Sequence, residues 1–205
     1  MGIVICAVFS YVYGAIPYAY IATYLLKHKK LTEEGTGNVG VTNAYKVGGV
    51  GAVLITITGE ISKALVPIYI AKTFFAGTLF VALLLVFCSL VGTSFSVFLK
   101  GRGGKGSTVA FWSILVLSPY SFLILLSTWL TFSLCARNNL LLKKIQLLCI
   151  PCAIFIVERD VLFTAFGILT SLLFYLNNYA RKDDFAYYNI FQQRSGIKDA
   201  GSIHH

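Results

Sequence analysis

Charged residues are scarce in this sequence, and their scarcity excludes a soluble fold. They make up 12% of the 205 residues, whereas soluble domains carry about 25%. A chain with so few charges cannot cover a surface that faces water. The 57% of apolar residues also exclude intrinsic disorder, which needs low hydrophobicity. The composition therefore predicts an integral membrane protein.

Histidine and cysteine are too few, or too unfavourably placed, for several kinds of active site. His28 lies in a lysine cluster, and His204 and His205 end the chain. The five cysteines lie in apolar stretches, and the Cys149-x-x-Cys152 pair has no second pair with which to hold a metal. We therefore expect no metal site, no cofactor and no histidine-based catalytic triad.

The charges that are present are mostly positive. Seventeen lysines and arginines stand against eight acidic residues, for a net charge of +9. In a soluble protein such an excess suggests nucleic acid as the partner. In a membrane protein, basic residues flank the spans on the cytoplasmic side and attract anionic head groups or phosphorylated substrates. We expect contact with membrane lipid and none with nucleic acid.

Long apolar runs alternate with short polar segments along the chain. The runs cover residues 2–26, 48–71, 73–99, 109–136, 145–157 and 161–176. About 20 apolar residues cross the hydrocarbon core as a helix, so the longer runs predict transmembrane helices. The first run lacks a basic start and a small-residue cleavage site, which indicates a retained span rather than a signal peptide.

The distribution of lysine and arginine predicts the topology. Most of these residues lie in four segments, at residues 27–46, 100–105, 137–144 and 181–198. The positive-inside rule favours the cytoplasmic side for all four. This holds with the N-terminus outside and the C-terminus in the cytoplasm, if the chain turns at Ser118–Pro119 and again at residues 158–160. We predict an all-α bundle of about seven transmembrane helices over residues 1–180, with a cytoplasmic polar tail at 181–205. Five spans are the alternative, with one basic segment outside.

A glycine-rich loop at residues 35–43 is the first candidate for chemistry. Gly35, Gly37 and Gly40 allow the backbone to approach a ligand closely, and successive N–H groups in such a loop form an anion-binding nest. Further donors and a helix N-terminus near the loop favour a phosphate. The polar side chains involved are Thr36, Asn38, Thr42, Asn43 and, about one turn later, Lys46. The alternative is a flexible loop between helices.

A second glycine-rich loop at residues 101–108 carries Arg102 and Lys105. It does not match the phosphate-binding pattern G-x-x-x-x-G-K-[ST], because Leu99 stands in place of the first glycine and Gly106 follows Lys105. Small residues around two cations nevertheless suit an anion, although an ordinary cytoplasmic loop has the same composition.

Two opposite charges lie inside an apolar run. Glu60 and Lys63 are three residues apart and so share one helix face. Charges at that depth are costly and are usually paired or functional. An ion pair within the helix is the simpler prediction, and a role in positioning the substrate is the other.

These segments together resemble the acyl-phosphate-dependent glycerol-3-phosphate acyltransferases, the PlsY family. Residues 35–43, Gly-Thr-Gly-Asn-Val-Gly-Val-Thr-Asn, are similar to the family's G-S-G-N-x-G-A-T-N. Residues 14–17, Gly-Ala-Ile-Pro, resemble its Gly-Ser-Ile-Pro, and Glu60 with Lys63 resembles its Asp and Lys. Residues 98–106 resemble its F-L-K-F-K-G-G-K-G loop. The resemblance is strong over roughly residues 10–110 and collinear beyond them.

The resemblance implies a seven-helix bundle in the bacterial inner membrane. The implied reaction transfers an acyl chain from acyl phosphate to the 1-hydroxyl of glycerol-3-phosphate, giving lysophosphatidic acid and phosphate. The implied catalytic residues are Asn38, Lys105 and Asn178. The implied substrate-binding residues are Thr36, Gly37, Gly40, Thr42, Asn43, Lys46, Gly103, Gly104, Arg137 and Arg181. Lys46 stands where the family has arginine.

The chain departs from the family pattern at several positions. Thr93 follows Gly92 where the family has histidine, and Tyr175 replaces the histidine of H-x-x-N-x-x-R. Arg137 precedes asparagines rather than serines, and the closing G-T-E is not found. Both an active enzyme and an inactive relative are compatible with these departures. A small anion transporter would predict an internal repeat, which the sequence does not show.

Overall fold

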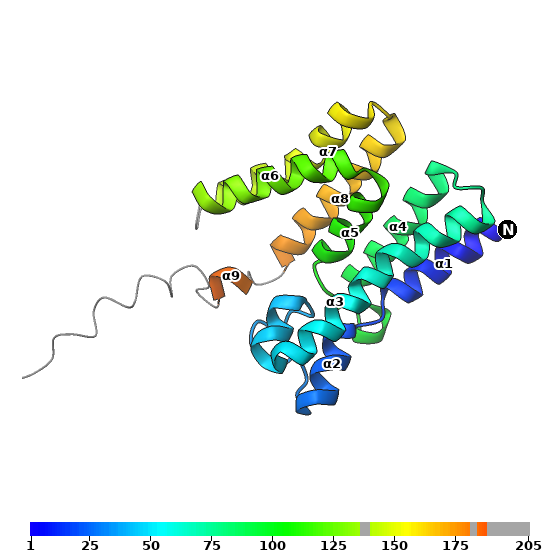
Figure 1. The fold of residues 1–205 in the computed structure, drawn as a ribbon. Helices are drawn as coiled ribbons and strands as arrows, with labels where there is room; N and C mark the ends of the chain where they lie inside the picture. Colours follow the sequence, from blue (N-terminus) through cyan, green and yellow to red (C-terminus); the bar gives the residue numbers. More distant parts are fainter. Residues whose placement is uncertain (136–139, 181–183, 188–205) are drawn as a thin grey trace, which may run out of the picture.

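The computed structural model describes residues 1–135, 140–180 and 184–187, and these residues form helices joined by loops (Figure 1). In chain order the helices are α1 (Gly2–Gly14), α2 (Tyr18–Lys27), α3 (Val41–Phe74), α4 (Leu79–Ser94), a 3-10 turn (Val97–Leu99), α5 (Ser107–Leu117), α6 (Pro119–Cys135), α7 (Leu140–Glu158), α8 (Val161–Ala180) and α9 (Asp184–Tyr187). The prediction of an all-α fold is confirmed for the described residues.

Three segments are long and apolar enough to cross a membrane. They are Gly2–Lys27, Val41–Phe74 and Leu79–Leu99. Four shorter apolar helices follow, at Ser107–Leu117, Pro119–Thr131, Leu147–Glu158 and Val161–Asn177. Large apolar side chains such as Val4, Phe74 and Tyr120 are exposed on the helices, as expected of surfaces that face lipid.

The first apolar run is two helices rather than one. Helix α1 ends at Gly14, and α2 begins at Tyr18. Pro17 has no backbone N–H to continue the helical ladder, so the chain breaks before α2. Gly14 also packs directly on α4, because a Cβ at this position would overlap the backbone of Ser89. The single helix expected over residues 2–26 is therefore wrong in detail, although the whole segment keeps the length of a span.

A second break lies within α3. Gly49 has φ 76° and ψ −168°, a backbone conformation that only glycine adopts easily. It separates a short first part from a long second part that carries the apolar run. The first part begins at Val41 and so provides the helix N-terminus expected near the first glycine-rich loop.

The predicted turns in the second half of the chain are confirmed. Helix α5 ends before Ser118, and α6 begins at Pro119; α7 ends at Glu158, and α8 begins at Val161. The Ser118 hydroxyl donates to the Glu158 carboxylate, so the two turns lie together at one end of the bundle. The side chain of Asp160 accepts from the N–H of Phe163 at 2.8 Å and caps α8.

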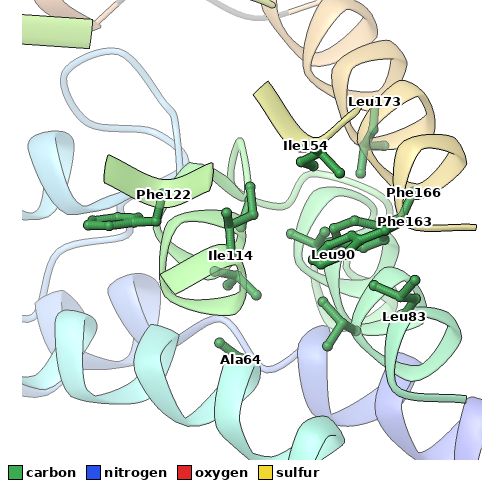
Figure 2. Close-up of a cluster of buried hydrophobic side chains, with 12 residues drawn as sticks. Ala64, Leu83, Leu90, Ile114, Phe122, Ile154, Phe163, Phe166 and Leu173 are labelled. Atoms are coloured by element: carbon green, nitrogen blue, oxygen red, sulfur yellow. The ribbon is translucent and has the colours of Figure 1, made fainter. Parts of the chain in front are cut away.

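The largest apolar core joins α3, α4 and α5 to the later helices. Figure 2 shows its side chains pointing toward one another from several helices. Its buried members include Ala64, Leu90, Ile114, Ile154 and Phe163. Helices α1 and α2 pack on α4 and α3 respectively. This arrangement holds the loop before α3 and the loop before α5 next to each other.

Candidate active site

One amide side chain holds the first glycine-rich loop in shape. Asn43 is fully buried in the first turn of α3. Its Nδ2 lies 3.4, 3.1 and 2.9 Å from the carbonyl oxygens of Leu31, Glu34 and Asn38, and its Oδ1 accepts from the N–H of Thr36 at 3.3 Å. These contacts organise the loop, and substrate binding by Asn43 stays a prediction.

Three backbone amides of the loop are bonded within the loop itself. The N–H of Asn38 donates to Thr36 Oγ1 at 3.3 Å, and the N–H of Gly37 donates to the carbonyl of Glu34 at 3.0 Å. With the N–H of Thr36 also bound to Asn43, these three amides are satisfied inside the loop. The expected nest of backbone N–H groups is therefore wrong at these positions. The hydroxyl of Thr36 and the amide of Asn38 serve as donors instead.

The second glycine-rich loop packs directly on the first. Gly104 donates from its N–H to the carbonyl of Thr93 at 2.8 Å. A Cβ on Gly104 would press on the carbonyl oxygen of Val39, and one on Gly103 would overlap that of Thr93. The absence of side chains at these two positions thus lets residues 103–104 lie between the end of α4 and the first loop. This contact brings Lys105 next to the first glycine-rich loop.

Three side chains from the two loops converge on one carboxylate. Thr36 Oγ1 donates to Asp184 Oδ1 at 2.5 Å, and Asn38 Nδ2 donates to the same oxygen at 2.9 Å. Lys105 Nζ lies 4.0 Å from Asp184 Oδ2. Thr36, Asn38 and Asp184 are all buried. We call Thr36, Asn38 and Lys105 the anion cradle, because a hydroxyl, an amide and an ammonium here surround one anion.

Two residues of this site were missed in the sequence. Asp184 falls in the segment predicted as a polar tail, yet α9 contacts α3. Asn177 is buried on α8 and donates from Nδ2 to Ser94 Oγ at 2.8 Å and to the carbonyl of Lys105 at 3.3 Å. The family motif pointed to the neighbouring Asn178, whose side chain lies outside the described part of the structure. Asn177 is adjacent to Asn178 in the sequence, and this pair of asparagines after an apolar run was the signal that could have identified it.

Three of the other predicted site residues lie at the start of α3. Gly40 precedes α3, Thr42 lies in its first turn, and Lys46 has an exposed side chain 6.0 Å from the ring centre of Tyr45. Arg137 and Arg181 lie outside the described residues. Among the residues that the structure describes, no group of three or more His, Cys, Asp or Glu could hold a metal ion.

The intramembrane charges form the predicted pair. Lys63 Nζ lies 2.6 Å from Glu60 Oε1, and both residues are buried. The ammonium also lies 5.4 Å from the ring centre of Tyr18, within the range of a cation–π contact. A small pocket beside the pair is lined by residues of both glycine-rich loops, including Val39 and Gly104. The ion pair thus adjoins the site from the bundle side.

Thr93 occupies the position where the family has histidine, and it has a structural contact. Its hydroxyl lies 3.0 Å from the carbonyl oxygen of Gly14 and 3.0 Å from that of Ser89. The hydroxyl therefore links the end of α1 to α4 directly beneath the second glycine-rich loop.

Solved structures share this fold. The crystal structure of PlsY (YgiH), an integral membrane glycerol 3-phosphate acyltransferase, in its glycerol 3-phosphate form matches with a TM-score of 0.74 and 24% identity, over 96% of this chain and 94% of that chain. Its lysophosphatidic acid form matches with a TM-score of 0.72 and 23% identity. The chain has several apolar helices and shares its fold with an integral membrane protein, and it is therefore a multi-pass membrane protein.

Curated relatives cover nearly the whole length. The glycerol-3-phosphate acyltransferase of Carboxydothermus hydrogenoformans is 28% identical over 96% of this chain and 95% of its own. Glycerol-3-phosphate acyltransferase 1 of Bacillus cereus (strain ATCC 14579) is 30% identical over 82% of this chain and 92% of its own. The sequence also matches the family described as glycerol-3-phosphate acyltransferase over residues 4–183. The chain therefore belongs to the glycerol-3-phosphate acyltransferase family of enzymes.

Proposed function

We propose that this chain transfers an acyl group from acyl phosphate to the 1-hydroxyl of glycerol-3-phosphate, giving lysophosphatidic acid and phosphate. The observation that carries the proposal is the anion cradle. Thr36, Asn38 and Lys105 come from two loops far apart in sequence and surround one carboxylate. The same donors suit a phosphate oxygen, because hydrogen bonds from charged or polar donors to an anion are among the stronger ones in proteins.

Acyl phosphate is the proposed acyl donor, because its chemistry suits a site that binds an anion. Acyl phosphate is a mixed anhydride, so it needs no covalent enzyme intermediate, and its leaving group is phosphate. The protein then has to position two substrates and stabilise charge that develops on the leaving oxygen. A hydroxyl, an amide and an ammonium around one anion provide that stabilisation.

In the proposed step the glycerol hydroxyl oxygen attacks the carbonyl carbon of acyl phosphate. The new carbon–oxygen ester bond forms, the bond between the carbonyl carbon and the phosphate oxygen breaks, and its electron pair leaves with phosphate. The hydroxyl proton passes to the leaving phosphate. A hydrogen bond that strengthens by about 2 kcal/mol in the transition state accelerates the step roughly 30-fold, so each cradle residue contributes measurably.

The membrane location fits the substrates. The acyl chain lies among the apolar helices, and glycerol-3-phosphate approaches from the cytoplasm, the side on which the positive-inside rule predicts both glycine-rich loops. We assign the protein to the bacterial inner membrane. Each substrate carries one phosphate, and Asn178, Arg137 and Arg181 are further candidates for contact with the phosphate that the cradle does not bind.

The test is phosphate release by the purified full chain in lipid. Release from acyl phosphate should depend on added glycerol-3-phosphate and yield lysophosphatidic acid. Lys105→Ala and Asn38→Ala should each lower kcat/KM at least about 30-fold, which corresponds to one charge-assisted bond of roughly 2 kcal/mol. Lys29→Ala is the matched control, because Lys29 is exposed and lies 3.7 Å from Glu34 at the surface.

Three outcomes would contradict the proposal. Full activity in both cradle variants would reject the site. Transfer from acyl-CoA but not from acyl phosphate would reject the donor. Absence of lysophosphatidic acid from the native chain would favour an inactive relative, or a transporter if phosphate crosses sealed vesicles.

A further inference from the structure

The anion cradle holds an anion that belongs to the chain itself. Asp184 lies on α9, beyond the last long helix, and its carboxylate accepts from Thr36 and Asn38 while facing Lys105. The side chain is buried against these donors, with 8% of the residue exposed. A carboxylate and a phosphate present similar oxygens to such donors, so Asp184 lies where a substrate oxygen is proposed to bind.

Asp184 and a phosphate cannot share the cradle. Thr36 has one hydroxyl hydrogen, and it is directed to Asp184 Oδ1. A phosphate dianion placed beside the carboxylate would also meet a like charge at close range, which disfavours both ionised forms. Binding of phosphate to Thr36, Asn38 and Lys105 therefore requires Asp184 to leave them.

The contacts favour a competitor over a catalytic base. A general base needs an available lone pair directed toward the proton that it removes. Asp184 Oδ1 already accepts two hydrogen bonds, and Oδ2 faces the Lys105 ammonium.

Asp184 belongs to the same chain as the cradle, so its carboxylate is present there at a high effective concentration. Residues 181–183 alone separate α9 from the end of α8 at Ala180. A group held by a short tether reaches an effective concentration in the millimolar range. Enzymes bind their substrates with KM values of about 1 μM to 1 mM, so a weak but tethered carboxylate can oppose a dissolved phosphate.

We infer that Asp184 is a built-in competitor for the anion cradle, which phosphate must displace to bind. The inference rests on the proposed function, since the cradle is the proposed phosphate site. When the competent state is a fraction f of the molecules, the apparent dissociation constant rises by 1/f. If Asp184 occupies the cradle in about nine molecules of ten, its removal tightens phosphate binding about tenfold.

The test compares Asp184→Asn with the native full chain in lipid. Asparagine keeps the shape and an accepting oxygen but removes the charge. Binding of inorganic phosphate, measured by calorimetry without turnover, should become several-fold to tenfold tighter. In steady state, KM for one phosphate substrate should fall by the same factor. Measuring KM separately for glycerol-3-phosphate and acyl phosphate shows which phosphate Asp184 opposes.

A matched control separates competition from a general change in charge. Glu33→Gln removes one negative charge from an exposed side chain, whose carboxylate lies 3.5 Å from Lys30 near the same loop. Phosphate affinity should change less than twofold. An equal gain in both variants would overturn the inference. Asp184→Ala, which removes the accepting oxygens as well, should tighten binding at least as much as Asp184→Asn.

The two proposals fail in different ways. Unchanged or weaker phosphate binding in both Asp184 variants overturns the competitor, whatever the activity. A large fall in kcat with unchanged KM also overturns it, because that result makes Asp184 a catalytic group. Tighter phosphate binding in a chain that forms no lysophosphatidic acid supports competition and rejects the proposed reaction.

Discussion

At the scale of single residues, Asn43 determines the shape of the first glycine-rich loop. Its amide reaches three carbonyl oxygens and its own oxygen accepts one N–H. Asn43→Ala leaves these buried groups unpaired, at about 1–3 kcal/mol for each unsatisfied group. We expect a lower unfolding temperature in detergent and a loss of acyl transfer.

Asn43→Asp makes the same prediction more specific. It keeps the acceptor for Thr36 but directs carboxylate oxygens at carbonyls that need a donor. It should therefore be at least as damaging as Asn43→Ala. Retention of native stability by Asn43→Asp would show that the loop does not depend on these donated bonds.

The buried Glu60–Lys63 pair supports a second prediction at this scale. Removing one partner of a buried ion pair costs about 3–5 kcal/mol, since it leaves an uncompensated charge. Lys63→Ala should therefore lower the unfolding temperature strongly. Lys63→Met combined with Glu60→Gln should recover most of the loss. The comparison is the exposed pair of Lys30 and Glu33, where Lys30→Ala should cost about 0–1 kcal/mol.

Equal melting of Lys63→Ala and the native chain would contradict the prediction. A double variant as unstable as the single one would show that the two residues contribute through packing rather than through their mutual charge.

Sequence reasoning identified three cradle residues but not the group they bind. Thr36, Asn38 and Lys105 lie in glycine-rich polar segments, and such segments can be recognised from the sequence alone. Asp184 lies among other polar residues after the last apolar run, and its burial depends on a contact between segments about 80 and 150 residues apart. Such a contact has no local pattern.

At the scale of elements, two glycines set the distance between α1 and α4. A Cβ on Gly14 would overlap the backbone of Ser89, and one on Gly92 would overlap the carbonyl of Tyr11. Small residues allow helices in membranes to approach closely. Here the approach lets Ser96 Oγ donate to the carbonyl of Ala15 at 2.5 Å, which fixes the chain next to the second glycine-rich loop.

Gly92→Ala should therefore destabilise the protein, although alanine is intrinsically better in a helix by about 1 kcal/mol. Backbone atoms cannot move aside as side chains can, and overpacking of this kind costs about 1–3 kcal/mol. The readout is thermal unfolding. Gly2→Ala is the control, because its new methyl group would meet a ring carbon of Phe75 at 3.8 Å, and it should melt like the native chain.

Element boundaries were predictable where proline or charge interrupts an apolar run. The turns at Ser118–Pro119 and residues 158–160 follow from such interruptions. The break at Gly49 does not, since Gly48, Gly49 and Gly51 lie together and no local pattern distinguishes one of them. The break between α1 and α2 did have a signal in the sequence, namely Pro17. The length of the apolar run over residues 2–26 nevertheless favoured one continuous helix.

At the scale of the whole molecule, the two turns of the second half lie at one end of the bundle. The bond from Ser118 to Glu158 joins the α5–α6 turn to the α7–α8 turn. The cradle contacts Asp184 at the opposite ends of these helices, since Lys105 lies just before α5 and Asp184 just after α8. If each of α5 to α8 crosses the membrane, the turns lie outside and the cradle lies in the cytoplasm, as the basic residues require.

Cysteine labelling tests this topology directly. In a chain whose native cysteines are replaced by serine, single cysteines are introduced as Lys29→Cys, Arg102→Cys, Thr78→Cys and Arg159→Cys, all at exposed positions. A membrane-impermeant maleimide added to intact cells should label positions 78 and 159. Positions 29 and 102 should react only after the membrane is opened. Seven spans place Arg159 outside, whereas five spans bury it in the middle of a span, where it reacts from neither side. Labelling of positions 29 and 102 from opposite sides would separate the two glycine-rich loops, and no cradle made of both could then bind phosphate.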